Sequence, residues 1–250
     1  MHKYMLPITA LSCAALACAT LVSNVPTFAW QPDFDHVLVE YACYGGLVPT
    51  GFYDNYIPPV RLHGDGTLTW VENDGSARRV LQSTLSETEV TGVLQHVADA
   101  GYFGWKDDYP ASEMIYDGTD CRLSVHLDST SKTVWMRAGS EAPPGFADLV
   151  AWLTSGAGAS GQDYVPETGW LSAIPTQPSE TPPVLIWPDE GLGGVRLSEA
   201  LQAVPAEGEA LATAWRIVNG DRYAQVEYLG IRYQLVVQVA GVTDRWPGSP

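Results

Sequence analysis

Apolar and polar residues alternate along several short stretches in the first half of the chain. A period of two places alternate side chains on opposite faces of a β-strand, so each stretch is predicted to be a strand with one apolar face. The clearest pair surrounds Gly64-Asp65-Gly66, where Asp-Gly supplies the positive φ of a tight hairpin. The alternation predicts a hairpin at residues 60–72 and further strands at residues 36–43, 77–81, 121–127 and 133–137.

The hydrophobic period becomes that of an α-helix after residue 85. Ser86 and Glu89 have the spacing of a capping box, Leu85 and Val90 that of a hydrophobic staple, and Gly101 the position of a C-cap glycine. A second, shorter helix follows Pro143-Pro144 and ends at Gly156. Its predicted apolar face consists of Phe146, Leu149, Val150 and Leu153.

The second half of the chain is less regular. Residues 155–188 are rich in Gly, Ser, Thr and Pro, which predicts a linker or a loose wrap anchored by Tyr164, Trp170 and Trp187. Beyond it, residues 198–204 are predicted to form a short helix, and residues 211–218, 223–228 and 231–239 three strands. Asn219-Gly220 is the expected type I′ turn between the first two strands.

The predicted fold class is α+β, with a mostly antiparallel sheet on which one well-capped and one shorter helix pack, plus a small C-terminal α+β extension. The expected organisation is a signal peptide at residues 1–29, an α+β domain at 30–154, the linker at 155–188 and the C-terminal region at 189–250.

The first residues have the composition of a secretory signal peptide. A short basic start precedes the apolar run of residues 4–22, and Thr27 and Ala29 fit the rule for signal peptidase, so the mature chain is predicted to start near Trp30. An uncleaved membrane anchor and lipid attachment at Cys18 are less favoured alternatives. Polar residues interrupt the run, and the leucine before Cys18 is one position out of step with a lipobox. We therefore expect secretion or a cell-envelope location.

The charge of the chain narrows the classes of partner. Lys and Arg number 13 against 29 Asp and Glu, a net charge of −16. Such a surface repels phosphates, which argues against binding to nucleic acid or anionic membranes. No second apolar run is long enough to span a membrane. The expected partner is a protein, a peptide or a glycan.

Two of the four cysteines lie in the leader, which leaves Cys43 and Cys121 in the mature chain. Each falls on the apolar face of a predicted strand, and two thiols in an oxidising compartment most simply form one bridge. We predict a Cys43–Cys121 disulfide. A thiolate metal site would need Cys-x-x-Cys or finger-like His spacing, which the sequence lacks.

Conventional catalytic and metal motifs are absent from the sequence. The densest carboxylates lie between Asp107 and Asp120, and Asp117 and Asp120 are weak Ca²⁺ candidates, but calcium-loop spacing is missing. Histidines, including His63, lack zinc-site spacing and are expected at the surface. Ser129-x-x-Lys132 lies in a predicted hairpin turn, whereas that motif requires a helix start. We predict no catalytic residue and no cofactor.

The aromatic content is high, with Trp at 9 positions and Tyr at 12. Aromatic rings in loops offer apolar area with a polar tip, which suits a binding face for sugars or peptides. The residues predicted to bind a ligand are Tyr53, Tyr56, Trp170 and Trp187. The alternative, which the low Phe content favours, is that these rings belong to the core of a β-rich domain.

Four features together resemble a group of uncharacterised, secreted or lipid-anchored bacterial cell-envelope proteins. They are the strand ending in Cys43, the hairpin Arg61-Leu62-x-Gly64-Asp65-Gly66-Thr67-Leu68, the helix start Leu85-Ser86-x-x-Glu89 and the strand entry Asp117-x-x-Asp120. The resemblance covers residues 37–153 and consists of turns and caps. It implies a bacterial envelope setting and no particular activity.

The leading hypothesis is a non-catalytic exported envelope module that binds a protein, peptide or glycan through loops rich in Tyr and Trp. One alternative is an exported hydrolase that uses the carboxylates from Asp107 to Asp120. Another is a protease inhibitor with a rigid loop at residues 47–59.

Overall fold

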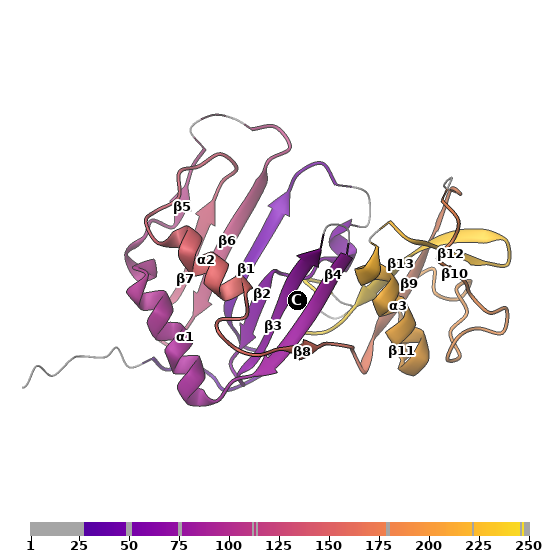
Figure 1. Ribbon diagram of the computed structural model, residues 1–250, viewed down its shortest axis with the longest axis horizontal. Helices are drawn as coiled ribbons and strands as arrows, with labels where there is room; N and C mark the ends of the chain where they lie inside the picture. The colour runs from indigo at the N-terminus through magenta and orange to yellow at the C-terminus, as the bar shows by residue number, and fades with distance from the viewer. Residues whose placement is uncertain are drawn as a thin grey trace, which may run out of the picture.

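The alternating segments of the first half form an eight-stranded sheet in the order β5-β7-β6-β1-β2-β3-β4-β8 (Figure 1). This computed structural model describes residues 28–48, 52–74, 77–111, 113, 115–178, 181–221, 223–245 and 247, so the predicted leader up to Thr27, with Cys18, lies outside the described residues. The strands are β1 (Val37–Gly45), β2 (Val60–His63), β3 (Thr67–Asp74), β4 (Ala77–Thr84), β5 (Asp108–Tyr109), β6 (Thr119–His126), β7 (Ser131–Met136) and β8 (Gln162–Asp163).

The predicted β2-β3-β4 meander and the β6-β7 hairpin are both confirmed. Strand β1 lies between them and pairs antiparallel with both β2 and β6. All neighbours in this sheet are antiparallel except β5 and β7. The β1–β6 register sets Cys43 directly opposite Cys121, and the predicted disulfide joins them across a Cα–Cα distance of 4.0 Å.

Two helices cover one face of this sheet, α1 (Glu87–Asp99) and α2 (Phe146–Thr154) (Figure 1). The Ser86–Glu89 capping box of α1 is confirmed, and Gly101 adopts a left-handed conformation just after the helix. The apolar stripes of α1 and α2 pack on alternate residues of the strands. The largest buried side chains of this core include Leu38, Leu62, Leu68, Leu94, Tyr102, Leu123, Leu149 and Leu153.

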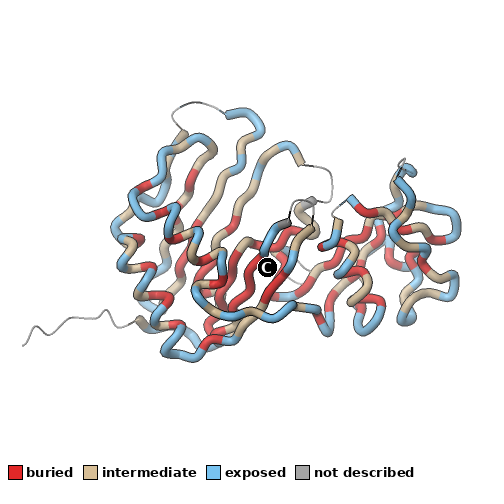
Figure 2. Tube along the Cα trace, in the orientation of Figure 1, coloured by how far each residue is buried: buried red, intermediate tan, exposed pale blue. Residues whose placement is uncertain are grey.

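A second, five-stranded sheet lies beside the β4 end of the first, in the order β10-β12-β13-β9-β11 (Figure 1). Its elements are β9 (Thr168–Thr176), β10 (Leu185–Ile186), β11 (Val204–Glu207), α3 (Gly208–Gly220), β12 (Gln225–Tyr228) and β13 (Ile231–Gln238). Helix α3 packs on this sheet, and its core continues into Val71 and Val80 of the first sheet. Figure 2 shows buried residues running along the strands of both sheets. The predicted α+β fold class is confirmed.

The structure corrects three secondary-structure predictions in this region. Residues 211–218 form most of α3 rather than a strand, because their buried members, Leu211, Ala214, Trp215 and Val218, recur at helical spacing. Asn219-Gly220 therefore ends a helix and is not a hairpin turn. Residues 198–204 are turns leading into β11 rather than a helix.

The linker predicted at residues 155–188 is also wrong, because this segment supplies β8, β9 and β10. Glycine residues allow the backbone of this segment to pass close to other side chains after α2. A Cβ on Gly161 would collide with the Trp70 ring, so only glycine lets the chain pass over that ring and reach the open edge of β4. There β8 pairs with Leu81 and Gln82, and β9 then becomes an internal strand of the second sheet.

The short 3₁₀ helix η1 (Phe52–Asn55) joins the two sheets. The Asn55 side chain donates to the carbonyl of Leu235 at 3.0 Å and accepts from the amide of Val237 at 2.7 Å, both in β13. A second 3₁₀ helix, η2 (Tyr102–Gly104), follows α1. The two sheets are therefore connected by backbone-directed hydrogen bonds as well as by a shared apolar core.

Candidate functional site

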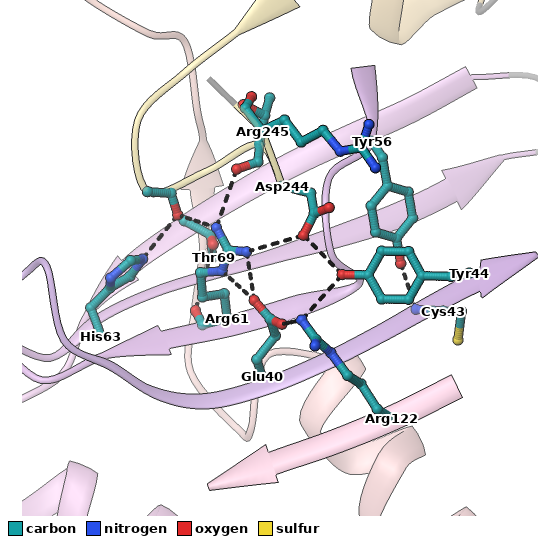
Figure 3. Close-up of polar contacts among 12 residues, drawn as sticks. Glu40, Cys43, Tyr44, Tyr56, Arg61, His63, Thr69, Arg122, Asp244 and Arg245 are labelled. Atoms are coloured by element: carbon teal, nitrogen blue, oxygen red, sulfur yellow. Dashed lines mark hydrogen bonds and ion pairs between the residues drawn. The ribbon is translucent and has the colours of Figure 1, made fainter. Parts of the chain in front are cut away.

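The face of the first sheet opposite the helices carries charged side chains that are nevertheless buried (Figure 3). Glu40 on β1 accepts hydrogen bonds from Arg61 Nε on β2 at 2.7 Å and from Arg122 Nη2 on β6 at 2.8 Å. Only 6 % of Glu40 and 4 % of Arg61 is exposed. Because side chains alternate along a strand, these residues point away from the core that their neighbours build under the helices.

Residues 241–245, at the other end of the chain, cover this charged face (Figure 3). Arg61 Nη1 donates to the carbonyls of Gly241 at 2.9 Å and Thr243 at 3.3 Å, and the Tyr44 hydroxyl donates to Asp244 Oδ1 at 2.8 Å. Burial raises the pKa of Tyr44, and the hydrogen bond to Asp244 raises it further, so the phenol stays protonated. Glu40, Arg61, Arg122 and Asp244 each lie within ion-pair distance of an opposite charge, which suits attachment of the C-terminal segment rather than acid–base chemistry.

His63 belongs to the same face, and its predicted surface position is wrong. Its exposed fraction is 1 %, its Nε2 lies 3.0 Å from the Gly241 carbonyl, and its ring stacks on Phe34 with centroids 4.4 Å apart. Burial lowers the pKa of His63. The imidazole thus joins the segment before β1 to the segment after β13, two stretches whose meeting local sequence cannot reveal.

Tyr53 and Tyr56 complete the end of β1 instead of forming a binding surface. Beyond Tyr41 the strand no longer pairs with β2, and the tyrosine hydroxyls take the place of the missing strand. Tyr56 Oη accepts from the Cys43 amide at 2.6 Å, and Tyr53 Oη bonds both the amide and the carbonyl of Gly45 at 2.6 Å. The predicted ligand-binding role of Tyr56 is corrected, because its ring is buried.

Of the carboxylates between Asp107 and Asp120, the side chains of Asp107, Asp108 and Asp120 pair with cations of the protein itself. Asp107 accepts from Lys132 Nζ at 2.7 Å, and Arg137 bridges Asp108 at 2.8 Å and Asp120 at 3.1 Å. The Ala138 amide, with Arg137, lowers the pKa of Asp120. Asp117 occupies a left-handed turn position at φ 59°. Within the described part of the chain, no group of three or more His, Cys, Asp or Glu side chains could hold a metal ion.

The two predicted tryptophans have opposite environments. Trp187 is fully buried, and its Nε1 donates to the Val195 carbonyl at 2.9 Å, so its predicted contact with a ligand is corrected. Trp170, on β9, is only half-buried and faces a cleft of about 660 Å³ where the two sheets meet. We call this cleft the junction cleft.

Strands from both sheets line the junction cleft. Side chains of β4, β8 and β9 form two walls, and Phe34 with residues 239–240 forms another. The cleft is therefore adjacent to the His63 contact, which holds Phe34 against Gly241. Its hydrogen-bonding residues are Gln82, Ser83, Thr84, Ser160, Gln162, Asp163, Glu167 and Thr168, and its aromatic residues are Phe34, Tyr164 and Trp170.

A second cleft, of about 540 Å³, lies between β9, β11 and the loop at residues 193–195. Thr168 and Trp170 line both clefts, so the two clefts are neighbours at these residues. We call the two clefts together the Trp170 groove. Its lining includes Gly193 and Gly194, both with positive φ, a backbone conformation that favours glycine.

The Trp170 groove is acidic. Asp163, Glu167 and Glu207 line it, and none of the described lining residues is Lys, Arg or His. Asp163 pairs with Arg79, which lies outside the lining. Burial and the nearby Glu167 carboxylate raise the pKa of Tyr164 to about 12, so this phenol remains a neutral donor at physiological pH. The groove can therefore offer both donors and acceptors without a positive charge.

Sequence patterns anticipated Trp170 and missed the rest of the groove. The polar residues of β4 and β8 carry no motif, and they meet Trp170 only because β8 extends the first sheet beside β9. The signal that named Trp170 was the high content of aromatic residues, although the residue lies on strand β9 and not in a loop.

Comparisons with known proteins provide no relative for this groove. No family model matches the chain, and no curated protein is significantly similar to it. Among the described residues, no helix is both long and apolar enough to cross a bilayer.

Proposed function

We propose that the protein is a non-catalytic binding module of the bacterial cell envelope or the secreted fraction, and that its ligand occupies the Trp170 groove. One observation carries this proposal: a half-buried tryptophan lines two clefts, and the larger of them is rich in amides, hydroxyls and carboxylates. Binding sites combine an aromatic anchor with a few polar groups in this way.

The disulfide supports the exported setting. Disulfides persist in oxidising compartments and are rare where thiols are kept reduced, and Cys43–Cys121 joins two neighbouring strands of the first sheet. The resemblance over residues 37–153 points to the same setting.

The alternative hydrolase has less support. A general acid or base needs a carboxyl group free to exchange a proton with the substrate, whereas Asp107, Asp108 and Asp120 are paired with Lys132 or Arg137. For the inhibitor hypothesis, part of the loop at residues 47–59 lies outside the described residues, and Tyr53, Asn55 and Tyr56 turn inward to bond the backbone.

The proposal is tested by binding of the secreted full chain to an array of polysaccharides and an array of random peptides. We expect signal on one array, and we expect Trp170→Ala to reduce that signal about tenfold or more, because the ring is the anchor of the site. Tyr116→Ala is the matched control, since Tyr116 is 83 % exposed and lies outside the groove. Signal that survives Trp170→Ala, or no signal on either array, would refute the proposal.

A further inference from the structure

We infer that the ligand of the Trp170 groove is an uncharged oligosaccharide chain that crosses Trp170 and occupies both clefts. This inference rests on the proposed function, because it names the ligand of the same site. The charge of the groove supplies the first argument. Three carboxylates and no described Lys, Arg or His line it, in a chain with net charge −16. Polyanions such as nucleic acids and uronic-acid polymers would be repelled.

The hydrogen-bonding chemistry of the walls supplies the second argument. Gln82 and Gln162 carry amides, and Ser83, Thr84 and Thr168 carry hydroxyls. These groups both donate and accept, as the hydroxyls of a sugar do. Glu167, which makes no ion pair among the described residues, adds a strong acceptor. An apolar ligand would leave these groups without partners and would bind weakly for that reason.

The position of Trp170 supplies the third argument. A pyranose ring has an apolar face of C–H groups and a rim of hydroxyls, which matches an aromatic plane surrounded by polar side chains. The clefts on either side measure about 660 and 540 Å³, and both fall in the range of roughly 300–1,000 Å³ typical of ligand pockets. A chain of several sugar units fills both clefts while one unit stacks on the indole.

A peptide fits the same groove less well. Extended peptides bind by adding a strand to an exposed sheet edge. Here β8 offers only 2 residues, and on the edge strand β11 the residue opposite Trp170 is Pro205, which has no N–H to donate. A cationic peptide could still use Glu167 and Glu207, and the experiment must therefore distinguish charge from stacking.

The experiment is calorimetric titration of the full chain with five kinds of probe: neutral hexasaccharides of β-1,4-glucan, β-1,3-glucan and β-1,4-N-acetylglucosamine, an oligogalacturonate, and a lysine-rich decapeptide. We expect one neutral hexasaccharide to bind about tenfold more tightly than its disaccharide, because only the longer chain reaches both clefts. Binding should change less than about twofold between low and high salt, since no ion pair forms.

Four variants make the result specific. Trp170→Ala should weaken hexasaccharide binding about tenfold or more, Trp170→Tyr should keep most of it because a ring remains, and Tyr116→Ala should leave it within about twofold. Glu167→Gln separates the ligand classes, because the amide still accepts from a sugar hydroxyl but cannot pair with a cation. Thermal melts confirm that each variant is folded. If Trp170→Ala does not fold, the difference in affinity between hexasaccharide and disaccharide in the wild-type chain remains the test.

The outcomes distinguish failure of the oligosaccharide inference from failure of the proposed binding function. If the decapeptide or the oligogalacturonate binds, depends on Trp170 and weakens with salt while no neutral sugar binds, the groove is a binding site and the inference is wrong. If no probe binds, or if Trp170→Ala leaves every binding signal unchanged, both the inference and the proposed function fail.

Discussion

The two faces of the first sheet are built from the same alternation and yet are covered in different ways. On one face, alternate residues such as Leu62 and Leu68 pack under α1 and α2, which lie within the same half of the chain. On the other face, Arg61 and Glu40 are as well buried, but they are covered by residues 241–245 (Figure 3). The period of two therefore predicts which residues share a face of the sheet. It does not predict whether the polar face is exposed to solvent.

The difference has an energetic side. The apolar face stabilises the fold by removing apolar surface from water, and this contribution depends little on how the side chains are oriented. The charged face depends on each partner being present, since burying an unpaired charge costs far more than losing a surface ion pair. Predictions for the two faces should therefore differ in how specifically they respond to substitution.

The largest expected effect comes from the covalent link at the end of β1. Replacing both cysteines (Cys43→Ser with Cys121→Ser) should lower the free energy of unfolding by about 4–5 kcal/mol, because the bridge closes a loop with a sequence separation of 78. Urea unfolding measures the change, and the reduced wild-type chain should match the double variant. An unchanged urea midpoint would show that the strand pairing, and not the bridge, holds β1 to β6.

The next effect concerns the charged face. Glu40→Ala should lower the free energy of unfolding by about 3–5 kcal/mol, because it leaves Arg61 buried beside no carboxylate of β1. Glu72→Ala is the matched control, since Glu72 also pairs with an arginine, but both side chains are more than half exposed. Its effect should be much smaller. Equal losses in the two variants would mean that the charged face is hydrated.

The smallest effect is a pH dependence from His63. Burial lowers its folded pKa below the 6.5 of an ordinary imidazole, so on acidification the unfolded chain takes up this proton first. Stability should be fully present above about pH 6.5, should fall as the pH drops below that value, and should level off below the folded pKa. Urea midpoints across this range should show a shallower pH slope for His63→Gln. If the slope is the same in both proteins, the imidazole is accessible to water.

Local patterns identified the elements whose signals lie within a few residues. The capping box at Ser86 and Glu89, the hairpin around Asp65 and the Cys43–Cys121 pairing all appeared as predicted. Capping and turn geometry depend on immediate neighbours, so they survive whatever the tertiary context is. The segment at Leu211 failed because a short apolar run suits either a strand or a buried helix, and packing between two sheets decided the matter.

The groove shows the same limit for function. Trp170 and Trp187 were equal candidates from sequence, since both are aromatic residues in a stretch of Gly, Ser and Pro. In the folded chain Trp187 is completely buried, whereas Trp170 lines two clefts. The residues next to each tryptophan do not distinguish the two, because the exposure of a ring depends on which segments, distant in sequence, pack against it.

The sequence by itself therefore determined strands β1 to β4, β6 and β7 of the first sheet, its two covering helices, the disulfide and the acidic charge, all of which follow from local spacing and composition. Only the tertiary structure decided that Glu40, Arg61 and His63 would be buried and that Gln82, Gln162 and Trp170 would meet in one groove. The physical reason is that a period of two assigns residues to the two faces of a sheet. The segments that cover each face are distant in sequence, so no local pattern predicts them.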